Sequence, residues 1–113
     1  MDLKKLHVLL VCNLGASTGV MVAKMRDIAA NSKSLANTDV KIDARPAGDI
    51  KEYLANYDVV LMGPQIKHQY DRLKKICDEH NKPIGIIDMK DYGFVNGGNI
   101  LKQAILLTLN HTA

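Results

Sequence analysis

The sequence has few of the residues on which specialised small folds depend. Its 113 residues include no tryptophan, one phenylalanine, three prolines and two cysteines, Cys12 and Cys77. Two distant cysteines provide neither a disulfide framework nor the paired spacing of a metal site. Eight glycines without a repeat exclude a collagen-like chain, and 47% apolar residues exclude a disordered one. One globular domain that spans residues 1–113 is therefore expected.

Long apolar runs and concentrated positive charge are lacking too. The longest apolar stretches, residues 8–12 and 59–62, are far shorter than the roughly 20 residues of a membrane-spanning helix. The N-terminal segment has no small-residue cleavage site, so no signal peptide is expected. The net charge of +3 is dispersed, with no basic stripe or aromatic platform for a nucleic acid. We expect a soluble, cytoplasmic protein that binds no nucleic acid, has no direct membrane insertion and reaches a membrane only through a partner.

Short apolar segments alternate with segments of helical periodicity along the chain. Strands are expected at residues 7–11, 39–45, 57–62 and 84–88, and helices at about 18–32, 48–55, 65–80 and 100–110. A loop is expected at residues 92–99. This alternation predicts an α/β fold with a single open four-stranded parallel sheet and helices on both faces. Only the second strand alternates apolar and polar residues, so it belongs at an edge, and the expected strand order is 2-1-3-4.

Open parallel sheets bind ligands beyond the carboxyl ends of their strands, where the strand order reverses. With order 2-1-3-4 that point lies between the first and third strands, and Cys12 is expected as the first residue past the first strand. The candidate phosphate-binding loop follows it and consists of small residues: Asn13, Leu14, Gly15, Ala16, Ser17, Thr18 and Gly19. A possible partner-facing loop follows the third strand: Gly63, Pro64, Gln65 and Ile66.

The first loop has the features of an anion site beside a nucleophile. Its backbone N–H groups can turn inward, and the helix that follows, with Ser17 or Thr18 as the expected N-cap, adds partial positive charge. Such surroundings lower a thiol pKa, so Cys12 is expected to be a thiolate that attacks phosphorus. The loop fits neither the dinucleotide-binding motif nor the P-loop. The plainer alternative makes Cys12 a small buried residue that closes a strand.

Cys77 and the positions of the arginines indicate which reactions the protein can catalyse. Cys77 shares an apolar helix stripe with Leu73, so core packing is its expected role. A low-molecular-weight cysteine phosphatase has an arginine six residues after its cysteine, where this chain has Thr18. The next arginine, Arg26, lies about 12 Å further along the helix. Without a guanidinium to clamp the phosphoryl group, a phosphocysteine should form but resist hydrolysis, as in a phosphoryl carrier.

These residues resemble a known family. Residues 8–12 (Val-Leu-Leu-Val-Cys), then Gly15, Ser17 and Thr18, and residues 24–26 (Lys-Met-Arg) look like the IIB component of the bacterial phosphoenolpyruvate-dependent sugar phosphotransferase system (PTS), lactose/cellobiose family. Residues 58–66, 82–83 and 92–93 match that branch as well. Asn13 and Leu14 depart from the Ser-Ala that often follows the family's cysteine. Backbone donors are unaffected by this change, so it bears on sugar or partner preference more than on phosphotransfer.

The resemblance implies both a fold and a function. The fold would be the low-molecular-weight tyrosine phosphatase-like PTS IIB fold. Cys12 would accept phosphate from a phosphohistidine on the IIA component and pass it to a sugar bound by the membrane component IIC. The sugar would be a β-linked disaccharide such as cellobiose or chitobiose. The protein would be a cytoplasmic phosphotransferase, peripherally associated with the membrane through IIC, with no metal and no cofactor besides the covalent phosphoryl group.

Two alternatives stay open. One is a low-molecular-weight cysteine phosphatase-like enzyme, which the absence of an arginine six residues after Cys12 disfavours. Such an enzyme would also need an acid, for which Asp88 or Asp91 qualifies by position alone. The other is a non-catalytic regulatory domain of the same fold, in which no thiolate would be stabilised.

Overall fold

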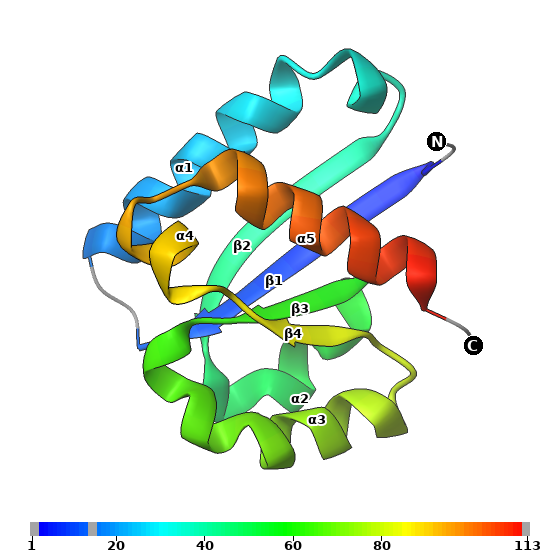
Figure 1. The fold of residues 1–113 in the computed structure, drawn as a ribbon. Coiled ribbons are helices and arrows are strands. Elements are labelled where there is room, and N and C mark those ends of the chain that lie inside the picture. The colour runs from blue at the N-terminus through cyan, green and yellow to red at the C-terminus, as the bar shows by residue number, and fades with distance from the viewer. Residues whose placement is uncertain (1–2, 14–15, 112–113) are drawn as a thin grey trace.

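Four parallel strands form the centre of the protein, in the predicted order 2-1-3-4 (Figure 1). They are β1 (Lys5–Cys12), β2 (Asp39–Pro46), β3 (Val59–Met62) and β4 (Ile84–Ile86). The structure is a computed structural model that describes residues 3–13 and 16–111, without the side chains of residues 16, 17 and 49. Every strand pairing is parallel, and the sheet order is β2-β1-β3-β4. The prediction of an open α/β sheet is therefore confirmed.

Helices cover both faces of this sheet (Figure 1). The α-helices are α1 (Ala16–Ala30), α2 (Ile50–Tyr53), α3 (Tyr70–Glu79), α4 (Met89–Gly93) and α5 (Gly97–Asn110). Short 3₁₀ helices complete the connections: η1 (Lys33–Leu35), η2 (Ala47–Asp49), η3 (Leu54–Asn56) and η4 (Pro64–Gln69). Helices α1 and α5 lie on one face, and α2 and α3 on the other. Among the described residues, no helix is both long and apolar enough to cross a bilayer.

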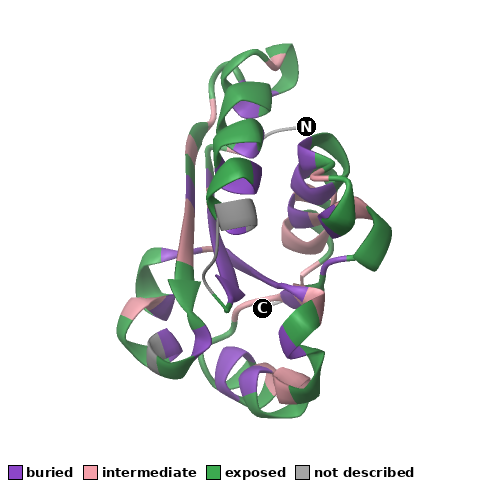
Figure 2. Ribbon diagram, turned by 90° about the vertical axis from the view of Figure 1, so that its left-hand side faces the viewer, coloured by how far each residue is buried: buried purple, intermediate pink, exposed green. Residues whose placement is uncertain are grey.

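The apolar strands are buried because both of their faces are covered (Figure 2). Along β1, Leu6, Val8 and Leu10 point into the core beneath α1 and α5. The alternate residues Leu9 and Val11 point into the second core, beneath α2 and α3. The period-two alternation of a strand thus distributes one apolar run between two cores.

The edge strand and the second cysteine behave as predicted. In β2 only Ile42 is buried, while its other residues are exposed or half-buried, which fits an edge strand. Cys77 is fully buried in the second core together with Leu73. Burial raises the pKa of the Cys77 thiol to about 11, so it stays protonated and inert at neutral pH.

The loop predicted at residues 92–99 is wrong, because the end of α4 and the start of α5 occupy most of it. Two side chains cap these helices. Asp88 accepts hydrogen bonds from the backbone N–H groups of Lys90 at 2.8 Å and Asp91 at 3.3 Å. Asn96 accepts one from the N–H of Asn99 at 3.0 Å. Capping Asp and Asn residues are the standard signal of a helix start, and the cap at Asp88 also explains why β4 ends at Ile86 rather than at residue 88.

The helix predicted at residues 65–80 is also only partly right. Its first residues form the 3₁₀ helix η4, with Pro64 in its first turn and a non-helical conformation at Ile66 (φ −112°, ψ 22°). The α-helical part begins at Tyr70. The break at Ile66 lets that side chain enter the second core, where it is 1% exposed.

Candidate functional site

Cys12 lies at the carboxyl end of β1, between β2 and β3, at the predicted point of strand-order reversal. It is the last residue of the strand, paired with Pro46, and not the first residue beyond it. Its thiol donates a hydrogen bond to Thr18 Oγ1, with a distance of 3.4 Å between Sγ and Oγ1. Cys12 is 3% exposed and Thr18 2% exposed. The thiol is therefore buried just beneath the protein surface, at the point where the strand order reverses, and it contacts the first turn of α1.

The candidate phosphate-binding loop is shorter than predicted. Helix α1 begins at Ala16, so Ser17 and Thr18 lie inside its first turn, and the prediction that one of them is the N-cap is wrong. Thr18 faces inward, where its hydroxyl contacts side chains. Asn13 and Gly19 are exposed, and Leu14 and Gly15 lie outside the described residues. The first turn of an α-helix leaves its backbone N–H groups without partners inside the helix, and Thr18 brings this turn into contact with Cys12.

The loop after β3 does adjoin Cys12. The N–H of Gly63 donates to the carbonyl of Val11 at 2.9 Å. A Cβ atom placed on Gly63 would lie 3.2 Å from Cys12 Cβ, 2.8 Å from Gln65 Oε1 and 3.6 Å from Tyr92 Cε2. Gly63 thus lies directly against Cys12 and Tyr92, where the end of β3, helix α4 and Cys12 meet. We call this position the floor of the site.

Only half of that loop can face a partner. Pro64 is half-buried and Gln65 is exposed, but Gly63 and Ile66 are buried. The prediction of a partner-facing loop is therefore wrong for Gly63 and Ile66, because the first packs on Cys12 and the second fills the core. Pro64 and Gln65 remain candidates.

Tyr92 is a site residue that the sequence pattern did not identify. Its hydroxyl lies 3.0 Å from Thr18 Oγ1, and the residue is 7% exposed. Its contact with Thr18 joins residues that are 74 positions apart, so no local pattern marks it. The one sequence feature that could have identified Tyr92 is the tyrosine-glycine pair at residues 92–93, which is part of the family resemblance.

The electrostatics of Cys12 differ from the prediction. Burial raises the pKa of the Cys12 thiol, and the hydrogen bond with Thr18 lowers it to a smaller extent. This direction is opposite to the lowered pKa expected from the sequence, since desolvation disfavours the charged form. The resting group is a neutral thiol that donates to Thr18.

A pH profile of alkylation follows from these directions. We expect iodoacetamide to modify Cys12 faster than Cys77, because Cys77 is the more strongly shifted and lies in the core. The rate at Cys12 should still be climbing above pH 8.5, because its raised pKa leaves the thiol protonated there. Peptide mass spectrometry after timed quenching measures both rates. A Cys12 rate that is already at its plateau at pH 6 would contradict the neutral thiol.

The groups that a phosphatase needs are occupied elsewhere. Arg26 donates to the carbonyl of Ile42 from Nε at 2.9 Å, and its guanidinium also contacts Asp43 at 3.0 Å, so it is tied to β2. Asp88 caps α4, and Asp91 accepts from Asn99 Nδ2 at 2.9 Å. Across residues 3–13 and 16–111, no three His, Cys, Asp or Glu side chains gather as they would around a metal ion. The other two arginines are also engaged, since the Arg45 guanidinium lies 4.5 Å from the centre of the Tyr53 ring and Arg72 donates to Gln69 at 2.6 Å. Among the described contacts, none brings a guanidinium to Cys12.

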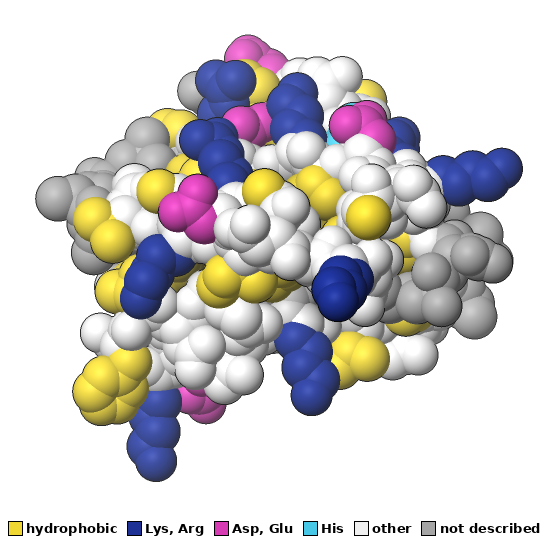
Figure 3. Space-filling model, turned by 90° about the horizontal axis from the view of Figure 1, so that it is seen from above, with side chains coloured by type: hydrophobic (Ala, Val, Ile, Leu, Met, Phe, Trp, Pro, Cys, Tyr) yellow, Lys and Arg dark blue, Asp and Glu magenta, His cyan; other side chains and the backbone are white. Residues whose placement is uncertain are grey.

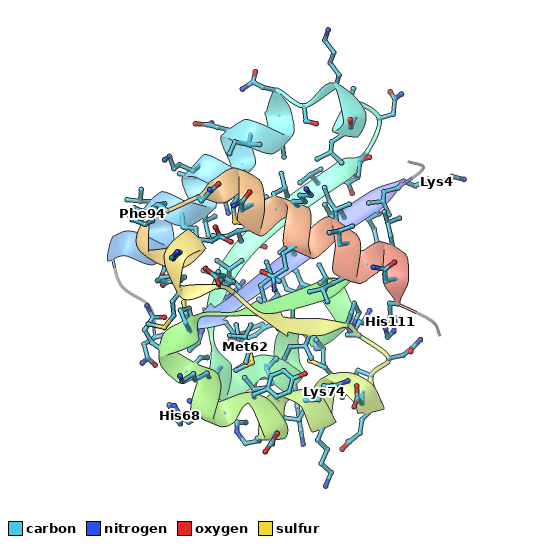
Figure 4. All side chains as sticks on the ribbon, viewed as in Figure 1. Lys4, Met62, His68, Lys74, Phe94 and His111 are labelled. Atoms are coloured by element: carbon cyan, nitrogen blue, oxygen red, sulfur yellow. The ribbon has the colours of Figure 1, made fainter. Side chains whose placement is uncertain are left out.

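Exposed apolar side chains lie on neighbouring elements. Val20 on α1, Met89 on α4 and Phe94 just after α4 are 54%, 71% and 80% exposed. Figure 4 shows Phe94 at the opposite side of the molecule from Lys4 and His111. A hollow of about 250 Å³ between η4 and α4 is lined by Pro64, Gln65, Met89, Tyr92 and Gly93. Exposed apolar side chains beside a hollow are typical of a docking surface. We refer to Met89, Phe94 and this hollow as the docking surface.

Two other surface features lie apart from this site. A larger hollow of about 530 Å³ is lined mainly by residues of α3, β4 and α5, and of the candidate site residues only Asp91, proposed as an acid by position, lines it. On the face seen in Figure 3, basic and acidic side chains are interspersed with apolar ones, without a continuous basic stripe. That face offers no obvious phosphate-backbone track.

Known proteins resemble this chain over nearly its whole length. A family model described as "PTS system, Lactose/Cellobiose specific IIB subunit" matches residues 7–103. The oligo-beta-mannoside-specific EIIB component of Bacillus subtilis is 33% identical over 103 residues, which cover 91% of this chain and 96% of the relative. The cellobiose-specific EIIB component of Lactococcus lactis subsp. lactis and the galactose-specific one of subsp. cremoris are each 33% identical over 100 residues, covering 84% of this chain and 89% of each relative.

Solved structures agree with the fold. The solution structure of a cellobiose-specific phosphotransferase IIB component protein from Borrelia burgdorferi superposes with a TM-score of 0.76 at 32% identity, covering 96% of each chain. The lactose-specific IIB component domain from Streptococcus pneumoniae gives a TM-score of 0.69 at 23% identity, covering 97% of this chain and all of the other. The second likeness concerns the fold alone.

Proposed function

The chain belongs to the lactose/cellobiose-specific IIB family of the sugar phosphotransferase system, and we propose that Cys12 is the residue that carries the phosphoryl group. EIIB components of this family act as phosphotransferases in sugar uptake. The observation that supports Cys12 most strongly is its place at the end of β1, against the first turn of α1. A phosphoryl group on Sγ would meet the unbonded N–H groups of that turn.

The transfer step balances with a neutral thiol. The donor is a phosphohistidine on IIA. As Sγ of Cys12 attacks phosphorus, an S–P bond forms and the P–N bond breaks. The histidine nitrogen keeps the electron pair of the broken bond and takes up the thiol proton. A donor that accepts a proton in this way does not need a preformed thiolate, so the raised pKa of Cys12 is compatible with the reaction.

The second step passes the phosphoryl group to a sugar bound by the membrane component IIC. A sugar hydroxyl oxygen attacks phosphorus, the S–P bond breaks, and the sulfur leaves with its electron pair as a thiolate. The hydroxyl proton is then available to the thiolate or to water. Water itself should attack the phosphocysteine slowly, because Arg26 is held on β2 and no guanidinium clamps the transition state. Neither a metal nor another cofactor takes part, and the protein works in the cytoplasm, attached to the membrane through IIC.

For the sugar we propose a β-linked disaccharide such as cellobiose or chitobiose. Two of the relatives at 33% identity are named for oligo-beta-mannosides and cellobiose. A galactose-type substrate is the second candidate, because a relative of the same identity is named for galactose. Equal identity to proteins named for three sugars is what one expects when specificity resides in the transporter that binds the sugar.

The test is a coupled transfer assay. The chain is mixed with phosphorylated IIA and vesicles that contain the matching IIC, and sugar phosphate is measured for cellobiose, chitobiose, a β-mannoside disaccharide and galactose. Formation of a sugar phosphate only when the chain is present supports the proposal. Release of inorganic phosphate at the same rate without sugar would instead support the phosphatase alternative, and no consumption of phosphorylated IIA would support the regulatory one.

The docking surface predicts an affinity change. We expect Phe94→Ala and Met89→Ala to raise the Kd for IIA by about 5- to 30-fold each, since truncating a well-packed apolar anchor costs roughly 1–2 kcal/mol. Titration calorimetry with unphosphorylated IIA measures the change. The matched control is Leu109→Ala, a leucine that is 48% exposed near the end of α5 and distant in sequence from α4. An unchanged Kd in both α4-region variants would place IIA on another surface.

A further inference from the structure

Three side chains from different elements form a hydrogen-bonded series that ends at the nucleophile. Cys12 Sγ donates to Thr18 Oγ1 at 3.4 Å, and Thr18 Oγ1 lies 3.0 Å from the Tyr92 hydroxyl. The exposed fractions of the three residues are 3%, 2% and 7%. Thr18 is the one buried polar residue among those whose burial the structure describes. A hydroxyl at that depth needs a partner, and here both of its neighbours belong to this series.

The fold holds Tyr92 in place independently of the active-site loop. Tyr92 lies in α4, and its N–H donates to the carbonyl of Asp88, the residue that caps this helix. The tyrosine ring also lies beside Gly63, where a Cβ atom would be in van der Waals contact with Tyr92 Cε2 at 3.6 Å. Helix α4 lies next to the start of α1 in Figure 1. Tyr92 thus approaches Thr18 from a buried position on α4, and Cys12 approaches it from the end of β1.

We propose that Tyr92 is a positioning residue that acts on Cys12 through the Thr18 hydroxyl. The inference rests on the proposed function of Cys12 as the phosphoryl carrier. A hydroxyl has one proton to donate and two lone pairs that accept, so Thr18 can bond both neighbours but can donate to only one of them at a time.

The direction depends on what the sulfur carries. While Cys12 is a thiol, it donates to Thr18, and the Thr18 proton is available for the Tyr92 oxygen, since either hydroxyl can be the donor in that pair. Once the sulfur has lost its proton or bears a phosphoryl group, it has nothing to donate. The Thr18 proton then turns to the sulfur or to a phosphoryl oxygen, and the Tyr92 O–H donates to the lone pair that Thr18 has left open. Bonds of this kind in series strengthen one another, so Tyr92 favours the charged states of Cys12 over the thiol.

The test measures the alkylation rate of Cys12 by iodoacetamide across pH, which reports the thiolate and requires no partner protein. Tyr92→Phe keeps the ring on Gly63 and removes only the hydroxyl. We expect it to slow alkylation roughly threefold at a fixed pH below the plateau and to move the profile to higher pH. Thr18→Val should slow alkylation more, on the order of tenfold, because it removes the direct donor to the thiolate. Thr18→Ser, which keeps the hydroxyl, should restore most of the rate.

The double variant separates positioning from packing. If Tyr92 acts through Thr18, adding Tyr92→Phe to Thr18→Val should change the profile no further. The matched control is Tyr57→Phe, which removes a hydroxyl bonded to Asp43 at 2.7 Å, beside β2, and should leave the Cys12 profile unchanged. Thermal unfolding by circular dichroism checks that each variant is folded.

The outcomes also distinguish this inference from the proposed function. A Tyr92→Phe profile identical to that of the unaltered protein, or an effect of equal size in the Thr18→Val background, would overturn the positioning role. If the profiles shift as expected while phosphorylated IIA transfers nothing to the chain, the proposed function fails and the hydroxyl series remains. If transfer proceeds and the profiles do not shift, the proposed function stands and the positioning role of Tyr92 is overturned.

Discussion

Replacing the thiol by a hydroxyl is expected to end phosphoryl transfer. In Cys12→Ser the side chain keeps its size and can still donate to Thr18, so the fold should be unchanged. Serine, however, is a far weaker nucleophile than cysteine, because a hydroxyl holds its proton much more tightly than a thiol does. We expect transfer from phosphorylated IIA to fall by on the order of 10³-fold or more. Intact-mass spectrometry, which follows the gain of one phosphoryl group with time, measures the loss.

The second cysteine supplies the matched control. Cys77 is fully buried among the apolar residues of the α2/α3 side. Cys77→Ala should leave the transfer rate within about twofold and reduce the free energy of unfolding by about 1 kcal/mol, as the loss of a small buried group usually does. Equal loss of transfer in both cysteine variants would point to a general structural effect, and retained transfer in Cys12→Ser would remove Cys12 from the mechanism.

A side chain at Gly63 is expected to damage the site more than the fold. The first carbon of that side chain would already lie 3.2 Å from Cys12 Cβ and 2.8 Å from Gln65 Oε1. The Gln65 end can swing away, but Cys12 is held in β1. The backbone of Gly63, at φ −63°, suits any residue, so the effect of the substitution is steric and not conformational. In Gly63→Val the added methyl groups should displace the thiol from its position beside Thr18.

The expected loss is about 10²-fold in transfer rate, the usual consequence of misplacing a reacting group by about 1 Å. Stability should fall by about 1–3 kcal/mol, as overpacking typically costs. Gly48→Val is the control, because a Cβ at Gly48 meets nothing within 4 Å. Stopped-flow transfer kinetics and urea unfolding of both variants separate the two effects. A Gly63→Val protein that transfers at the rate of the Gly48→Val protein would show that Gly63 is not the floor of the site.

The sheet and the place of Cys12 could be predicted because they follow from strong local signals. Continuous apolar runs mark β1 and β3 as doubly buried, and the polar alternation of β2 marks it as an edge. The sheet order then follows, and with it the position of Cys12 at the reversal point. The family resemblance rested on the same segments.

The errors have physical reasons too. Helix α4 is a single short turn sustained by the Asp88 cap, and so brief a segment shows no periodicity. Ile66 comes shortly after a strand, where a loop residue is expected. The break in η4, however, directs its side chain into the core. The pKa of Cys12 depends on how deeply tertiary packing buries the thiol, which no neighbouring residue reveals. Tyr92 is a partner of Thr18 only because α4 and α1 meet in space.

The most direct test of the central claim is to find which atom carries the phosphoryl group. The chain is phosphorylated by phosphorylated IIA, digested at mildly alkaline pH, and its peptides are sequenced by fragmentation that retains labile groups. We predict that the phosphoryl group lies on the peptide that contains Cys12 and that prior alkylation of Cys12 prevents its appearance. A phosphoryl group that fragmentation assigns to His7, His68, His80 or His111, with Cys12 unmodified, would contradict the account.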